Sequence, residues 1–266
     1  MVTLTKPDTA GLKLVFSGRP DGRVLVFGNS LGSDISLWDE QASALAASFR
    51  IARFDFPGHG AAAFWPAQSV AGVAEALVRA LEEAGVEQFC YCGISMGGAV
   101  GMELALAMPD RLSALVLSNT AAEFGSAGFW TSRMEQARAH GLPSLSEATV
   151  ARWLSPAHRA ADPDLFRRLC AMFEQTGLEG YLQGCRLVRD FDVRGRLDRI
   201  TTPTLVIAGS SDLATPPAQS LALVSQIPHS RYLELDASHL AHLGQPSAFN
   251  NAVADFLDTS FEPIHV

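Results

Sequence analysis

The sequence has no run of roughly twenty apolar residues, which is the length that a transmembrane helix needs. Residues 1–7 have neither the basic start nor the apolar centre of a secretory signal peptide. These two absences predict no association with a membrane, and they make the cytoplasm the expected location. Disorder is excluded as well, because 48% of the residues are hydrophobic, enough for a substantial core.

An excess of positive charge is also missing. The formal net charge is −8 at pH 7, which argues against binding to nucleic acid or to an anionic membrane surface. The expected partner is a small molecule, and an anionic one would need a local cation in so acidic a protein. The composition makes no prediction about the oligomeric state.

Cysteine is scarce, with four residues in the chain. Cys90 and Cys92 fall on one face of an expected strand, where they are badly directed for a disulfide bond. Neither this pair nor Cys170 and Cys185 has the spacing of metal ligands. We therefore expect four reduced thiols, which suits the cytoplasm, and no metal site.

The chain does contain a regular alternation of strand-like and helix-like segments. Strands are expected at 12–16, 23–27, 50–54, 89–92, 112–117, 204–208 and 231–235, and helices at 37–48, 70–84, 98–108, 218–226 and 247–257. A turn rich in Gly and Pro between the first two strands suggests an opening hairpin. The alternation predicts an α/β fold with a mostly parallel central sheet and helices on both faces.

The interval 121–199 breaks this alternation, because it is helix-like and rich in arginine. It follows the carboxyl end of a strand, where open α/β sheets collect their chemistry. We therefore expect an inserted helical cap, or lid, at 121–199 and a core domain made of 1–120 and 200–266. The alternative is a set of extra helices that merely protect the sheet.

Gly93–Gly97 has the pattern Gly-x-Ser-x-Gly and lies between an expected strand and an expected helix. A strand, a sharp turn and a helix in this order form a nucleophile elbow, with the serine exposed at its tip. The glycines are needed because a Cβ at either place would collide with a neighbouring element. Ser95 is therefore the predicted nucleophile.

Asp212 and His239 each follow another expected strand, so they should gather at the same edge of the sheet as Ser95. The order Ser95, Asp212, His239 is that of the α/β hydrolases. We predict that His239 acts as general base and then as general acid. Asp212 would fix the tautomer of the imidazole and stabilise its charged form.

Three nearby residues offer alternatives. His242 could replace His239 as base, although it should lie about one helical turn away, and we interpret it as a polar neighbour. Asp236 could replace Asp212, but it precedes the histidine too closely to reach back easily. His59 follows another strand and is expected to be a turn residue.

An oxyanion needs hydrogen-bond donors, and the backbone N–H of Met96 is the expected first one, because it follows the nucleophile. The second donor should come from the loop after the strand at 23–27. That loop reads Asn-Ser-Leu-Gly at 29–32, and Leu31 is the expected donor.

Seven short sequence motifs are specific to a narrower family than the triad is. They occupy residues 27–34, 37–41, 92–98, 118–121, 129–133, 152–154 and 180–181. In these segments the chain closely resembles the bacterial 3-oxoadipate enol-lactonases, members of the α/β-hydrolase fold family, and the resemblance covers essentially the whole sequence.

The resemblance implies a serine hydrolase that opens 3-oxoadipate enol-lactone to 3-oxoadipate in the β-ketoadipate pathway of aromatic compound catabolism. It implies an acyl-enzyme and no metal or cofactor. The substrate carries a free carboxylate. Trp130 and Arg133 match the cap motif and are the expected apolar wall and carboxylate partner, with Trp153 as a further substrate contact. Arg138 and Arg152 are weaker candidates, and Arg133 could instead be a surface residue.

Two other functions stay open. One is a different carboxylesterase or a carbon–carbon hydrolase of the same fold, which a preference for uncharged esters would favour. The other is a ligand receptor built on the hydrolase fold, which slow single-turnover kinetics with a ligand-dependent partner would favour. A dehalogenase is disfavoured because that chemistry needs an acidic nucleophile in place of Ser95.

Overall fold

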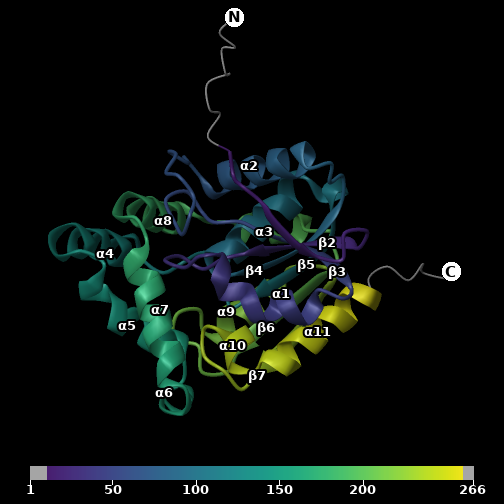
Figure 1. The fold of residues 1–266 in the computed structure, drawn as a ribbon. Helices are drawn as coiled ribbons and strands as arrows, with labels where there is room; N and C mark the ends of the chain where they lie inside the picture. The colour runs from purple at the N-terminus through teal and green to yellow at the C-terminus, as the bar shows by residue number, and fades with distance from the viewer. Residues whose placement is uncertain (1–10, 260–266) are drawn as a thin grey trace, which may run out of the picture.

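The computed structural model describes residues 11–259, and at its centre is a seven-stranded sheet (Figure 1). The strands lie in the order β1-β3-β2-β4-β5-β6-β7. Their bounds are β1 (Val15–Gly18), β2 (Arg23–Gly28), β3 (Phe49–Arg53), β4 (Phe89–Ile94), β5 (Leu112–Ser118), β6 (Thr204–Gly209) and β7 (Ser230–Leu235). Only the pair β1 and β3 is antiparallel among these strands. The predicted mostly parallel sheet is thus confirmed.

The predicted opening hairpin is wrong. β1 pairs with β3, and β2 lies between β3 and β4. The reason is burial. Leu25, Val26 and Phe27 of β2 have no exposed surface, so this strand needs neighbours on both sides, whereas β1 is short and largely exposed.

Helices cover both faces of the sheet. α2 (Val70–Glu83) and α3 (Met96–Ala107) pack together on one face, and α1 (Asp39–Leu45) and α11 (Pro246–Thr259) pack together on the other (Figure 1). α9 (Pro217–Val224) lies against β6 and β7, and the short α10 (Ala241–Gly244) precedes α11. Short 3-10 turns complete the set at η1 (Ile35–Trp38), η2 (Pro109–Arg111) and η3 (Arg194–Arg199).

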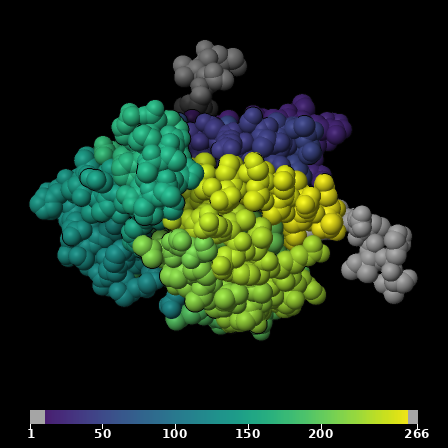
Figure 2. All heavy atoms as spheres, turned by 90° about the horizontal axis from the view of Figure 1, so that it is seen from below, coloured from purple at the N-terminus to yellow at the C-terminus, as the bar shows by residue number. Residues whose placement is uncertain are grey.

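Five further helices stand between β5 and β6, and we call them the inserted helices. They are α4 (Ala127–His140), α5 (Pro143–Trp153), α6 (Pro156–Ala161), α7 (Pro163–Gln175) and α8 (Leu178–Asp190). In the space-filling view they form the teal lobe beside the yellow C-terminal part (Figure 2). The predicted domain boundaries at 121–199 stay a prediction.

The two ends of this insertion meet. Glu123 and Asp192 form an antiparallel β-bridge, and the Val193 N–H donates to the Ala122 carbonyl at 3.0 Å. The chain therefore leaves the sheet and returns to it at nearly the same place.

The four cysteines are free thiols, and burial raises the pKa of Cys90 to about 12. No helix within residues 11–259 has the length and apolar character that crossing a membrane requires.

Candidate active site

Ser95 occupies the sharp turn between β4 and α3. Its φ of 54° and ψ of −116° are rare for a residue with a side chain, and such strain persists only where neighbours hold it. The Ser95 N–H donates to the Ser118 carbonyl at 3.1 Å, and the Ser95 carbonyl accepts from the Thr120 hydroxyl at 2.8 Å. The segment after β5 thus clamps the turn from both sides.

The glycines on either side of Ser95 permit unusually close backbone contacts. A Cβ at Gly93 would lie 2.3 Å from the Gly97 carbonyl oxygen, and a Cβ at Gly97 would lie 2.3 Å from the Gly28 carbonyl oxygen. Neither contact is possible for a larger residue without moving backbone. The elbow therefore depends on both glycines.

Asp212, on the loop after β6, accepts five hydrogen bonds. Its Oδ2 receives His239 Nδ1 at 2.8 Å, the Thr215 hydroxyl at 2.7 Å and Asn119 Nδ2 at 3.0 Å. Its Oδ1 receives the N–H groups of Ala214 and Thr215 at 2.7 and 3.0 Å. Burial raises the pKa of this carboxyl, but the adjacent His239 and these hydrogen bonds outweigh burial and hold the pKa well below its usual range.

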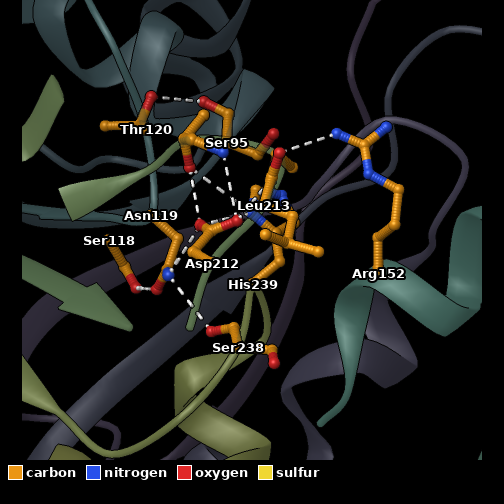
Figure 3. A network of polar contacts seen from close by, with 11 residues as sticks. Ser95, Ser118, Asn119, Thr120, Arg152, Asp212, Leu213, Ser238 and His239 are labelled. Carbon is orange, nitrogen blue, oxygen red and sulfur yellow. Dashed lines mark hydrogen bonds and ion pairs between the residues drawn. The ribbon is translucent and has the colours of Figure 1, made fainter. Parts of the chain in front are cut away.

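His239 lies on the loop after β7, with its side chain close to Asp212 and Ser95 (Figure 3). An ionised carboxylate can only accept, so the Nδ1 of His239 carries the proton and Nε2 is the acceptor. His239 and Ser95 line the same cavity. Within the described part of the chain the Ser95 hydroxyl has no hydrogen-bond partner, and such bonds are often long before a substrate binds.

The three alternative residues lie elsewhere. The buried His242 stacks on Trp38 with ring centres 4.3 Å apart, and burial lowers its pKa to about 3. His59 is buried next to the Pro57 carbonyl, and burial lowers its pKa to about 4. Asp236 is placed near the Ser210 hydroxyl and, among residues 11–259, forms no hydrogen bond with His239.

The two expected oxyanion donors are the backbone N–H groups of Leu31 and Met96. In the described chain, neither the Leu31 N–H nor the Met96 N–H donates a hydrogen bond. The Gly97 N–H donates to the Asn29 carbonyl at 2.9 Å, and Asn29 Nδ2 donates to the Phe54 carbonyl at 2.9 Å. These bonds hold the loop after β2 against the elbow and against the end of β3.

A cavity of about 270 Å³ opens beside Ser95. Aromatic and small polar side chains make most of its wall, and two arginines are its charged residues. The lining residues are Ser30, Leu31, Ser95, Phe124, Gly125, Phe129, Trp130, Arg133, Thr149, Arg152, Trp153, Tyr181, Val188, Ala214, Thr215 and His239. The predicted contacts Trp130, Arg133 and Trp153 are therefore brought together here, and Arg138 is not part of this wall.

Neither arginine has a carboxylate partner in the part of the chain that the structure describes. Arg133, on α4, donates to the Tyr181 hydroxyl and to the Thr149 hydroxyl. Arg152, on α5, donates to the Leu213 carbonyl at 2.9 Å (Figure 3). Two unpaired cations and no acidic side chain face the cavity, so it can accept an anion.

The sequence alone indicates no role for Asn119, Thr215 or Tyr181. A role for Asn119 was open to prediction, because it directly follows the carboxyl end of β5. Asp212 stands in a similar place, shortly after the carboxyl end of β6. Thr215 and Tyr181 offered no such signal, since their contacts depend on the fold of the loop after β6 and on the packing of α8.

Comparisons of the sequence and the fold with known proteins identify the family. The model of the alpha/beta hydrolase fold family matches residues 23–246. The chain is 35% identical to 3-oxoadipate enol-lactonase 2 of Acinetobacter baylyi, over 94% of both chains. It is 32% identical to the putative carbamate hydrolase RutD of Cronobacter turicensis, over 87% of this chain and 90% of the relative.

Among solved structures, the enol-lactonase from Burkholderia xenovorans LB400 is similar, with a TM-score of 0.90 and 34% sequence identity. The similarity covers 93% of this chain and 96% of that one. The chain is therefore a hydrolase of the α/β hydrolase fold family, and its resemblance to the 3-oxoadipate enol-lactonases is confirmed.

Proposed function

We propose that the protein is a 3-oxoadipate enol-lactonase of aromatic compound catabolism, acting in the cytoplasm. The charge of the cavity is the observation that carries this proposal. The candidate nucleophile shares a cavity with Arg133 and Arg152, which have no counter-ions there, in a chain with a net charge of −8. The carboxylate of a lactone would provide these arginines with an anionic partner, whereas an uncharged ester would leave both arginines without one.

In the proposed first step, the Ser95 hydroxyl attacks the lactone carbonyl carbon while His239 Nε2 takes up its proton. The carbonyl oxygen becomes an oxyanion, which would accept hydrogen bonds from the N–H groups of Leu31 and Met96. The ring C–O bond then breaks. The enol oxygen leaves with the proton from His239, and an acyl-enzyme remains on Ser95.

In the second step, His239 takes a proton from water, and the resulting hydroxide equivalent attacks the acyl carbon. Collapse of the second oxyanion returns the proton to Ser95 and releases the acid, whose enol converts to 3-oxoadipate. Asp212 stays ionised throughout and stabilises the imidazolium that forms twice. The residues of this site are sufficient for each of these proton transfers.

The inserted helices would act as the cap. α4 contributes Trp130 and Arg133 to the cavity wall, and α5 contributes Arg152 and Trp153. The tryptophans would cover the apolar ring of the lactone, and the helices would exclude bulk water from the acyl-enzyme. Specificity would thus come from the insertion and reactivity from the sheet.

The test compares two substrates by ultraviolet absorbance: freshly generated 3-oxoadipate enol-lactone and p-nitrophenyl acetate. The proposal expects a kcat/KM for the lactone above roughly 10⁴ M⁻¹s⁻¹ and a much lower value for the ester. Fast ester cleavage with slow lactone hydrolysis would instead favour another esterase or a carbon–carbon hydrolase of this fold. The similarity to a putative carbamate hydrolase makes a different hydrolase the second candidate.

Removal of either cavity arginine provides the matching prediction. Arg133→Ala and Arg152→Ala should each raise KM for the lactone by about tenfold to a hundredfold, the cost of a lost charged hydrogen bond. KM for p-nitrophenyl acetate should stay unchanged. Arg138→Ala is the control, since Arg138 lies on the same helix as Arg133 but outside the cavity wall. Equal effects of all three substitutions would contradict a specific carboxylate site.

A further inference from the structure

The segment at the end of β5 contacts the candidate nucleophile and the candidate acid at once. Ser118 and Thr120 hold the backbone of Ser95, as described above. Between them, Asn119 points its side chain toward Asp212 (Figure 3). Three consecutive residues therefore join two catalytic loops that are far apart in the sequence.

Asn119 is fully buried, and its φ of 46° makes it, with Ser95, one of two residues other than glycine with positive φ in the described chain. Its Oδ1 accepts from the Ser118 hydroxyl at 2.8 Å, which leaves Nδ2 to face the acid. Nδ2 donates to Asp212 Oδ2 at 3.0 Å and to the Ser238 carbonyl at 3.3 Å. Ser238 directly precedes His239.

We propose that Asn119 is a positioning residue of the triad, an inference that rests on the roles proposed for Ser95, Asp212 and His239. Its amide fixes Oδ2 of Asp212 where that oxygen meets His239. Its bond to the Ser238 carbonyl ties the loop after β7 to the same point. The orientation of the imidazole is thus set by three loops together.

The negative charge of the neighbouring Asp212 explains why a neutral amide occupies position 119. Asp212, from the loop after β6, and His239, from the loop after β7, are the titratable groups that contact the cluster among residues 11–259, and Thr215 and Ser118 add neutral hydroxyls. A carboxylate in place of Asn119 would face Asp212 at about 3 Å, and two like charges so close strongly perturb both titrations. A neutral donor avoids this.

Two substitutions separate the role of the amide from that of the backbone. Asn119→Gly and Asn119→Ala both remove the amide, but only alanine is strained at this φ. Both should lower kcat by about tenfold to a hundredfold, with KM for p-nitrophenyl acetate within about twofold of the wild type. If glycine restores wild-type kcat while alanine does not, the backbone and not the amide matters, and the proposal fails.

Asn119→Asp tests the charge with nearly the same shape. We expect the acid limb of the pH profile of kcat to move by about one unit or more, because a second carboxylate acts on Asp212 and His239 together. A profile that keeps its wild-type limbs would overturn the proposal. Circular dichroism and thermal unfolding of each variant would verify that the fold is retained.

Ser95→Ala, measured in parallel on the same ester, separates this inference from the proposed function. If Ser95→Ala keeps turnover, the triad itself is wrong. If Ser95→Ala is inactive and all three Asn119 variants match the wild type, only the positioning role is refuted.

Discussion

At the scale of single residues, two histidines three positions apart have opposite environments. His239 faces the cavity and donates to a carboxylate, whereas His242 lies in the core between Trp38 and Phe249. Burial without a charged partner lowers the pKa of His242 to about 3, so it stays neutral at any pH where the enzyme would work. Of these two histidines, His239 is the one that lines the cavity with Ser95, which supports the role of general base proposed for it.

Alanine substitution should separate the two roles. His239→Ala is expected to lower kcat at least roughly 10³-fold with little change in stability, because it removes the proposed general base. His242→Ala should leave kcat almost unchanged and lower the free energy of unfolding by about 3 kcal/mol, because it opens a cavity beside Trp38. Steady-state kinetics and urea unfolding of both variants check this, and a reversed pattern would exchange the assignments.

The sequence predicts a strand followed by a short polar loop before each of Ser95, Asp212 and His239, and the structure has such a strand in each case. Their catalytic roles stay a prediction. Asn119 follows the same rule, but its amide acts on a carboxylate 93 positions away, and no local pattern reports such a pairing. Arg152 is a weak candidate by sequence for a similar reason. Its place on the wall depends on how α5 packs, which composition does not reveal.

At the scale of elements, α8 meets the loop after β3 through three glycines. The Gly177 N–H donates to the Gly58 carbonyl at 3.0 Å, and a Cβ on Gly180 would lie 2.5 Å from the same carbonyl oxygen. Backbone thus touches backbone where an inserted helix meets the core. Tyr181, the next residue, accepts a hydrogen bond from Arg133, so this contact also supports the cavity wall.

Gly180→Ala should therefore damage the protein in two ways. The added methyl group meets backbone atoms that cannot turn aside, which is expected to cost about 2 kcal/mol of unfolding free energy. The displaced Tyr181 should also raise KM for the lactone. Gly128→Ala is the matched control, because its Cβ would have no atom nearer than 4.0 Å and it also lies in the first turn of a helix. In urea unfolding and lactone kinetics, the control should keep the unfolding free energy and the KM of the wild type.

Most elements were predictable from the sequence, as α2 illustrates. Val73, Leu77 and Leu81 recur at a spacing of four in the sequence, which is typical of a core-facing helix stripe, and all three are fully buried. The order of the first strands was not predictable from turn residues alone. A Gly- and Pro-containing turn predicts a hairpin, yet the burial of β2 on both faces decides that β3 and β4 are its neighbours.

At the scale of the whole molecule, two buried neutral histidines link stability to pH. The folded pKa is about 4 for His59 and about 3 for His242, in each case because burial disfavours the charged form. The unfolded value is near 6.5, so below that pH the unfolded chain binds protons that the folded chain does not. The stabilisation is complete above pH 6.5 and is lost as the pH falls toward the folded pKa values.

The free energy of unfolding should accordingly fall by about 2.7 kcal/mol per pH unit between roughly pH 6 and pH 4.5, the slope for two protons. Asp55, whose pKa is raised by burial, opposes this at the acid end of the range. Replacement of His59 by glutamine should halve the slope. Urea unfolding across this pH range measures it, and a flat profile for the parent protein would contradict the assignment.

The two ends of the insertion meet where Glu123 pairs with Asp192, and this allows the insertion to vary in length and sequence. A segment whose entry and exit adjoin can grow, shrink or be exchanged without altering the distance that the sheet must span. Under the cap role that we propose for the inserted helices, reactivity and selectivity are separable. We therefore expect that grafting the stretch between these two residues from a relative would transfer that relative's substrate preference and leave the proposed triad unchanged.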